Sequence, residues 1–179
     1  MANVIKLRKG LNIHLKGTAA QTKRVVGACA EYVVRPDTFE GVVPKLVVHE
    51  GDRVDVGDAL FVDKNFPEVK FASPVSGTVK AVERGERRKI LGIRLQADEV
   101  QKYHDFGRRD VSSLSSDDVK NALLEAGLFG YIYQLPYAVS TNPQTMPKAI
   151  FVSALRDMPL SNDFEYELQG NERDFQTGL

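Results

Sequence analysis

Alternating hydrophobic and polar residues in the middle of the chain predict two short strands joined by tight turns. Val54 and Val56 alternate with Arg53 and Asp55, and this run lies between the pairs Gly51-Asp52 and Gly57-Asp58. Glycine adopts positive φ at little cost, so both Gly-Asp pairs are typical of turns. The pattern indicates a half-buried sheet built of bent hairpins.

A second half of the same pattern follows about a dozen residues later. Pro74 cannot donate a hydrogen bond to a central ladder, so we expect it at the start or edge of a strand. Gly77 should bend the chain before alternation resumes over residues 78–82. Ile90, Ile93 and Leu95 then predict the last strand of a small sandwich, with Leu91 facing away.

Residues before the central pattern predict further strands. Apolar positions over residues 4–7 and 11–15 predict a hairpin around Lys9-Gly10. Residues 25–26 and 32–34 predict two more strands, and the second should end before Pro36 because a proline forces its predecessor into an extended conformation.

Helical signals are confined to the second half of the chain. Ser115 and the acidic residues after it predict the start of a helix over about 116–126, which Gly127 ends as a left-handed cap. The apolar run 149–154 is typical of a buried parallel strand. A terminal helix is expected from Asn171, with Phe175 as its apolar anchor.

Composition places the chain among globular proteins. It has 179 residues, 42% of them hydrophobic, and its 24 basic residues balance 24 acidic ones, which argues against a general nucleic-acid binder. No apolar run approaches the roughly 18–20 residues of a membrane span, and the first residues lack a signal-peptide core, so we expect a cytoplasmic chain. The single cysteine, Cys29, is expected to be a small buried thiol.

The central pattern resembles a known fold. The run from Glu50 to Leu60, followed by 74–79 with its Pro-x-x-Gly-x-Val spacing, resembles the barrel-sandwich hybrid of lipoyl and biotinyl carrier domains. The likeness concerns the fold, because one fold hosts many activities.

Segments outside the motif resemble one family in particular. They match, in the same order, the N-terminal part of the NqrA family, whose members are subunits of the sodium-translocating NADH:quinone oxidoreductase, over essentially all 179 residues. Members of that family are much longer, so the chain is expected to be an N-terminal fragment. The segments are Lys9-Gly10-Leu11, 61–65, 84–88 and 147–152.

The expected fold is mainly β with some α. A barrel-sandwich hybrid is followed by the truncated start of a Rossmann-like α/β domain, as the family resemblance implies. We predict an N-terminal β segment over residues 1–35 that packs on the hybrid domain, and the hybrid domain itself over 36–101. A connector with the helix occupies 102–147, and the α/β domain begins at 148 and runs to 179.

No catalytic residue and no metal ligand is assigned from the sequence. His49 has no second histidine or cysteine pair nearby, and the adjacent pair His104-Asp105 need not face one another. Carrier domains attach lipoate or biotin to a lysine at a hairpin tip midway between their two half motifs. Lys64 lies near this position but off centre, so we expect a surface or interface lysine and keep a Lys64 carrier arm as the alternative.

Two stretches are candidate interaction surfaces. Residues 80–94 hold six basic side chains against two acidic ones and could meet an acidic partner or anionic lipid, or could be a solvated hairpin tip. Residues 128–137 are rich in aromatic side chains, which suit interfaces, quinone-like ligand slots or packing between domains.

The resemblance implies a peripheral, quinone-proximal subunit on the cytoplasmic face of the bacterial inner membrane. Its complex transfers electrons from NADH to ubiquinone and pumps sodium ions, with the flavins and the iron-sulfur centre in other subunits. This chain would then be structural and docking, with no covalently bound cofactor and no transmembrane segment. The lipoyl or biotin carrier is the alternative, and a related electron-transport complex, whose subunit continues into ferredoxin motifs, is a third hypothesis.

Overall fold

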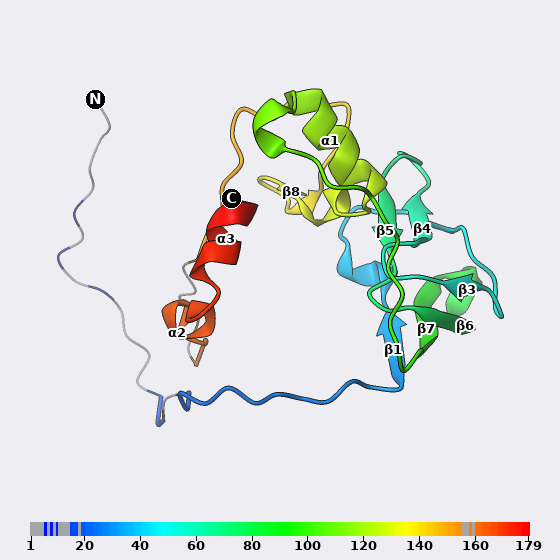
Figure 1. Ribbon diagram of the computed structural model, residues 1–179, viewed down its shortest axis with the longest axis horizontal. Coiled ribbons are helices and arrows are strands. Elements are labelled where there is room, and N and C mark those ends of the chain that lie inside the picture. The colour runs from blue at the N-terminus through cyan, green and yellow to red at the C-terminus, as the bar shows by residue number, and fades with distance from the viewer. Residues whose placement is uncertain are drawn as a thin grey trace. The chain divides into compact units, whose positions relative to one another are not determined.

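The computed structural model describes residues 6, 8, 10, 15–17, 19–154, 158 and 160–179 (Figure 1). The chain divides into two units. One holds residues 28–148, and the other joins the described residues before 28 to those from 149 onward. The strands of the described part of the chain all lie in the first unit.

The larger sheet is antiparallel, with strand order β1-β7-β6-β3. Val79 of β6 lies opposite Leu95 of β7, and both side chains are fully buried. The register shifts between Val79 and Ala81, and such bulges bend a strand and increase its twist. The strands are β1 (Glu31–Val34), β3 (Arg53–Val54), β6 (Gly77–Arg84) and β7 (Ile90–Ala97).

The smaller sheet has the order β2-β4-β5 and is also antiparallel. Its strands are β2 (Pro44–Leu46), β4 (Ala59–Asp63) and β5 (Lys70–Ala72). The rings of Phe61 and Phe71 stack with centroids 4.5 Å apart, and Phe39, just after the short helix η1 (Pro36–Thr38), packs 4.4 Å from Phe71. One hydrophobic core therefore contains side chains from both sheets.

Gly77 is required by the close approach of β6 to β7. A Cβ atom at this position would lie 1.9 Å from the carbonyl oxygen of Gln96, where no side chain fits. The sequence predicted a glycine bend here. The structure supplies a stronger constraint, since Gly77 pairs with Ala97 at the start of β6 and leaves no room for any other residue.

The helix predicted over about 116–126 is confirmed by α1 (Ser116–Glu125). Ser115 caps it: its hydroxyl accepts a hydrogen bond from the Asp118 amide, and the Asp118 carboxylate accepts one from the Ser115 amide. Gly127 follows with φ of +69°, the left-handed conformation expected at this position. The other elements of the unit are η2 (Glu86–Arg88), η3 (Val111–Ser113), η4 (Phe129–Tyr131), β8 (Tyr133–Gln134) and β9 (Val139–Ser140).

The described residues of the second unit form two short helices, α2 (Phe164–Leu168) and α3 (Glu172–Gly178). The rings of Phe164 and Phe175 meet edge to face at 5.6 Å. The predicted terminal helix with Phe175 as its anchor is thus confirmed, with Asn171 at the N-cap position.

Two predicted strands are wrong. Residues 149–154 form no strand, and the side chain of Phe151 is 84% exposed. Residues 25–26 form none either. Hydrophobic residues alone do not make a strand, because its backbone groups need a neighbouring strand to bond with, and neither segment pairs with one among the residues described. The hairpin predicted around Lys9-Gly10 lies largely outside the described residues.

Candidate docking surfaces and the Lys64 loop

Lys64 opens the loop that joins β4 to β5. Its amide donates to the carbonyl of Val43, at 2.8 Å, so its backbone is fixed to the segment before β2. The buried carboxylate of Asp63 accepts hydrogen bonds from the amides of Val43 and Asn65 and holds the base of the loop. The Lys64 side chain is exposed and, within the part of the chain that is described, forms no ion pair.

The loop itself is longer than a tight turn. It spans residues 64–69, with Phe66 packed against the core and Val69 1% exposed. A carrier lysine is expected at the tip of a tight hairpin, whereas Lys64 stands at the base of this loop. The geometry supports the expectation of a surface or interface lysine, and the carrier alternative stays a prediction.

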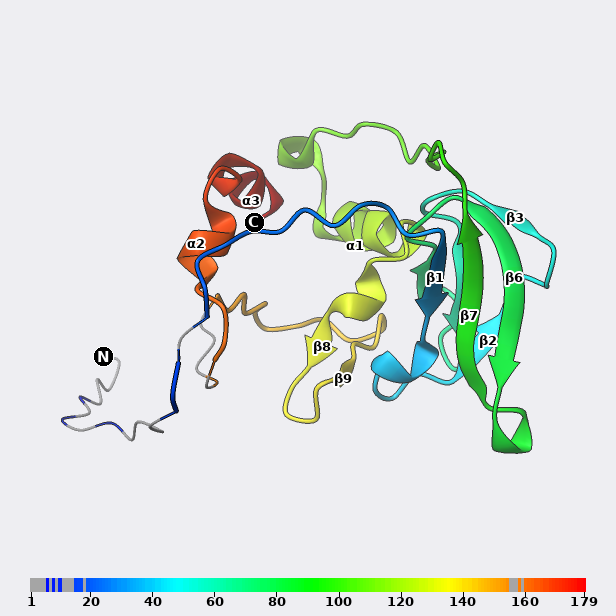
Figure 2. The same ribbon diagram turned by 90° about the horizontal axis from the view of Figure 1, so that it is seen from below.

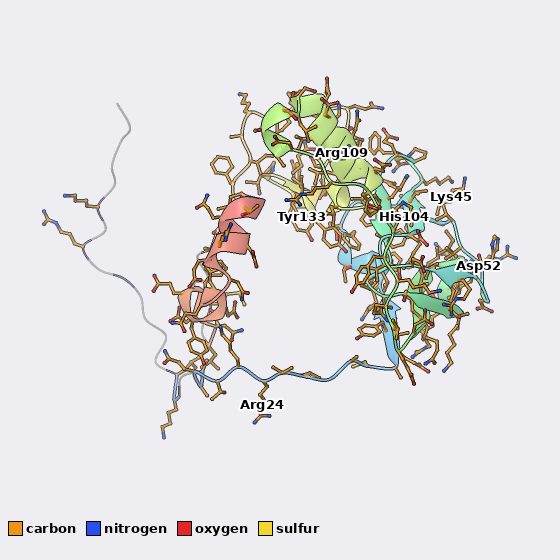
Figure 3. The ribbon with its side chains drawn as sticks, in the orientation of Figure 1. Arg24, Lys45, Asp52, His104, Arg109 and Tyr133 are labelled. Carbon is orange, nitrogen blue, oxygen red and sulfur yellow. The ribbon has the colours of Figure 1, made fainter. Side chains whose placement is uncertain are left out.

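His104 attaches the connector after β7 to the hybrid domain (Figure 3). Its ring Nδ1 lies 2.9 Å from Oδ1 of Asp58, and its amide donates to the carbonyl of Val56. The neighbouring Asp105 accepts a hydrogen bond from the amide of Gly107 instead. His104 and Asp105 are therefore not a pair, and no pattern in the sequence indicated the contact with Asp58.

An ion network crosses the outer face of the larger sheet. Glu31 of β1 pairs with Lys80 of β6 and Arg94 of β7, and Arg94 also pairs with Glu83. The hydrogen bond from the Lys80 ammonium, together with that from Arg94, holds the pKa of the Glu31 carboxyl below its usual value. Hydrogen bonds to Glu83 and Glu31 raise the pKa of the Arg94 guanidinium. Lys80 and Arg94, two of the six basic residues in the candidate surface 80–94, are thus neutralised within the sheet.

The remaining basic side chains gather at the tip of the β6–β7 hairpin, which Figure 2 shows projecting beyond the neighbouring strands. We call residues 84–89 the basic tip. Its members Arg84, Arg87, Arg88 and Lys89 are all exposed. The tip is closed by a hydrogen bond from the Gly85 amide to the Lys89 carbonyl, at 2.8 Å.

The aromatic stretch forms an exposed hairpin on a buried base. Phe129 is 8% exposed and belongs to the core, and the Tyr131 ring meets Phe39 edge to face at 5.0 Å. Burial raises the pKa of the Tyr131 phenol, and the nearby Tyr133 adds to this effect. Tyr131 is nevertheless 54% exposed, and Tyr133 (Figure 3) and Tyr137 are 51% and 80% exposed, so packing inside this unit accounts for only part of the aromatic stretch.

Cys29 is exposed, which makes the expectation of a buried thiol wrong. The amide of Cys29 donates to the hydroxyl of Tyr32, at 3.3 Å, and its thiol is left at the surface. In the same described part of the chain, no three His, Cys, Asp or Glu side chains gather as a metal site would require. His49 contacts Asp52, at 3.4 Å. No helix within the described ranges is long and apolar enough to cross a membrane.

Known proteins similar to this chain share one description. Residues 5–98 match the NqrA N-terminal barrel-sandwich hybrid domain, and residues 114–179 match the NqrA second alpha/beta domain. The corresponding subunit of the Na(+)-translocating NADH-quinone reductase of Yersinia pseudotuberculosis is 33% identical over 98% of the chain, and that of Actinobacillus pleuropneumoniae is 34% identical over the same share. That of Pseudomonas aeruginosa is 30% identical.

The chain spans 40% of the length of these curated relatives. The fold expectation is confirmed by both matches: a barrel-sandwich hybrid is followed by an α/β domain. Because the hybrid-domain match alone covers more than half of the residues, the chain belongs to the NqrA family, whose members are subunits of Na(+)-translocating NADH-quinone reductases.

Proposed function

We propose that this chain is part of a peripheral, quinone-proximal subunit of a sodium-pumping respiratory complex that transfers electrons from NADH to ubiquinone. The observation that carries the proposal is the family match, which extends over 98% of the chain to relatives named as one subunit of that enzyme. Within such a complex, residues 28–148 act as a structural and docking element, and the chemistry takes place elsewhere.

The side chains inside the hybrid domain support a structural and docking role. Its interior is filled mainly by aromatic and aliphatic side chains, among them Phe61, Phe71 and Leu95, and the ion pairs of Glu31 and Arg94 lie at the surface. Such a domain offers stable surfaces for partners. The flavins and the iron-sulfur centre are expected in the partner subunits, ubiquinone near the full-length subunit, and the subunit on the cytoplasmic face of the bacterial inner membrane.

The test is purification of the complex through an affinity tag on another subunit. The subunit that contains this chain should be present in the purified complex, and NADH-driven ubiquinone reduction and sodium uptake should fall when its gene is deleted and return when it is restored. The isolated chain should oxidise no NADH. Robust NADH turnover by the isolated chain without added flavin would contradict the docking role.

A further inference from the structure

The basic tip carries an unusual concentration of charge for this chain. Four cationic side chains and one carboxylate, Glu86, lie within six residues, although basic and acidic residues balance over the whole chain. All five side chains are exposed. The tip is therefore a local positive surface on a neutral molecule.

The cations of the basic tip form no ion pairs within the described part of the chain, although, after the hydrogen bond from Arg35, the charge of Lys89 helps to lower the pKa of the Asp37 carboxyl. Arg84 donates a hydrogen bond to the carbonyl of Arg88, at 3.4 Å, but none of the four cations forms an ion pair with a residue that the structure describes. Lys80 and Arg94, in the same hairpin, are both paired with carboxylates. The hairpin thus neutralises its stem and leaves its tip charged.

The backbone of the basic tip is held in a costly conformation. Arg87 and Arg88 have φ of +54° and +62°, in the left-handed region that residues other than glycine rarely adopt. Hydrogen bonds from the Gly85 amide to the Lys89 carbonyl and from the Lys89 amide to the Glu86 carbonyl fix this shape. This is the shape of a two-residue hairpin turn, which normally holds Asn or Gly, so two arginines at these positions cost stability.

We propose that the basic tip docks onto an acidic protein surface of a partner subunit. Arginine binds carboxylates through a planar fork, so arginines carried on a turn of fixed backbone shape suit a cluster of carboxylates. Attraction to anionic lipid is diffuse and needs no such geometry, so a flexible basic loop would serve it equally well. The held shape of the tip therefore favours a protein partner. The proposal rests on the proposed function, since it supposes that other subunits are present.

The experiment uses the full-length subunit and the remaining subunits of the complex, immobilised through a tag on one of them. The double variant Arg87→Glu/Arg88→Glu should bind about tenfold more weakly than wild type at 50 mM salt, because it loses electrostatic steering and its new carboxylates repel an acidic surface. Binding of the wild type should weaken as salt rises, and the variant should lose most of this salt dependence.

A matched control carries the same change of charge away from the basic tip. Lys45 of β2 (Figure 3) and Arg108 are exposed, and the double variant Lys45→Glu/Arg108→Glu should bind as the wild type does. The variant Arg87→Gly/Arg88→Gly keeps the backbone shape and removes its strain, so it should melt at least as high as wild type yet bind as weakly as the charge reversal. Its melting temperature separates lost docking from lost folding.

Three results would overturn the proposal. One is wild-type binding by both tip variants at every salt concentration. A second is unchanged binding to the subunits, with loss of binding to vesicles of phosphatidylglycerol and phosphatidylcholine, which would make lipid the partner. The third is failure of the wild-type subunit to bind at all. This result contradicts the proposed function itself, and it differs from failure of the tip proposal because the wild type, and not only the tip variants, then fails to bind.

Discussion

The imidazole of His104 lies 2.9 Å from the carboxylate of Asp58, a residue 46 positions earlier in the chain. A ring contact and a backbone hydrogen bond reinforce this contact. The Phe106 ring lies 4.5 Å from that of His104, and the amide of Val56 donates to the carbonyl of Lys102. Together these contacts lay the connector along the second Gly-Asp turn of the hybrid domain.

Replacing His104 should loosen the connector and leave the sandwich folded. His104→Ala removes one hydrogen bond between partly exposed groups, so we expect a loss of about 0.5–1 kcal/mol in unfolding free energy. Amide hydrogen exchange should accelerate at His104 and Val56, whose groups form the backbone contact. His104→Asn can keep a polar contact with Asp58 and is the control. Unchanged exchange in His104→Ala would show that the connector is held without this side chain.

A single methyl group at position 77 should damage the core sheet. Gly77→Ala places a Cβ against the Gln96 carbonyl, which belongs to the paired strand and cannot move away freely. We expect a loss of about 3 kcal/mol, the upper end of the cost of overpacking, measured by urea unfolding. Gly27→Ala is the control, because a Cβ there meets nothing within 4 Å. Equal midpoints for the two variants would contradict the close approach of β6 and β7.

The hybrid fold was predictable because its signals are local. Gly51 and Gly57 adopt φ of +94° and +100°, as the turn pattern required, and Val54 is buried at 4% exposure. The cap of α1 was equally predictable, because Ser115 and Asp118 form hydrogen bonds with each other within one turn of the helix. Such features depend on a few neighbouring residues, which a sequence displays directly.

The features that the sequence did not reveal depend on distant partners. Glu31 lies 49 residues from Lys80, so a count of charges over 80–94 overstates the free basic groups. Phe39 joins the core through ring contacts with Phe61 and Phe71 of the smaller sheet, and nothing in its neighbourhood in the sequence indicates this. The apolar run 149–154 forms no strand for a related reason. Its hydrophobic pattern is local, but a strand needs a partner strand from elsewhere in the chain.

The ion pairs of Glu31 should make part of the free energy of unfolding depend on pH in the acidic range. The pKa of Glu31 is lowered in the folded state, first by the Lys80 hydrogen bond and then by Arg94, from its ordinary value of 4.5. A lowered folded-state pKa contributes stability above the unfolded pKa, and this contribution is lost as pH falls through the folded pKa. Wild type should therefore be more stable than Glu31→Gln at pH 7, and the difference should shrink below about pH 4.

Urea midpoints at pH 7 and pH 3 measure this difference. The control is Glu68→Gln, because Glu68 is exposed and forms no ion pair with the residues described. Its midpoint should follow that of wild type at both pH values. A Glu31→Gln variant that loses no stability at pH 7 would show that the network contributes nothing, as many exposed ion pairs do.

The aromatic hairpin should divide into a structural base and a dispensable tip. The Tyr131 ring contacts Phe39 although the residue is 54% exposed, so Tyr131→Ala should cost about 1 kcal/mol through the lost aromatic contact and partial apolar burial. Tyr137 is 80% exposed, and Tyr137→Ala should change stability by less than about 0.5 kcal/mol. Thermal unfolding of both variants measures the contrast. A larger loss for Tyr137→Ala would mean that the tip packs on the fold in solution.

Lys64 should be unmodified when the subunit is purified from its native host. A carrier arm needs a lysine whose backbone can present it at a tight turn, whereas the Lys64 amide is bonded to Val43 and the loop beyond it is anchored through Val69. Intact mass spectrometry of the full-length subunit decides the point, because lipoate or biotin would add a fixed mass. Lys64→Arg keeps the charge and cannot be acylated by either group. This variant should show no added mass and should leave NADH-driven quinone reduction unchanged. An added lipoyl or biotinyl mass that disappears in Lys64→Arg would establish the carrier alternative instead.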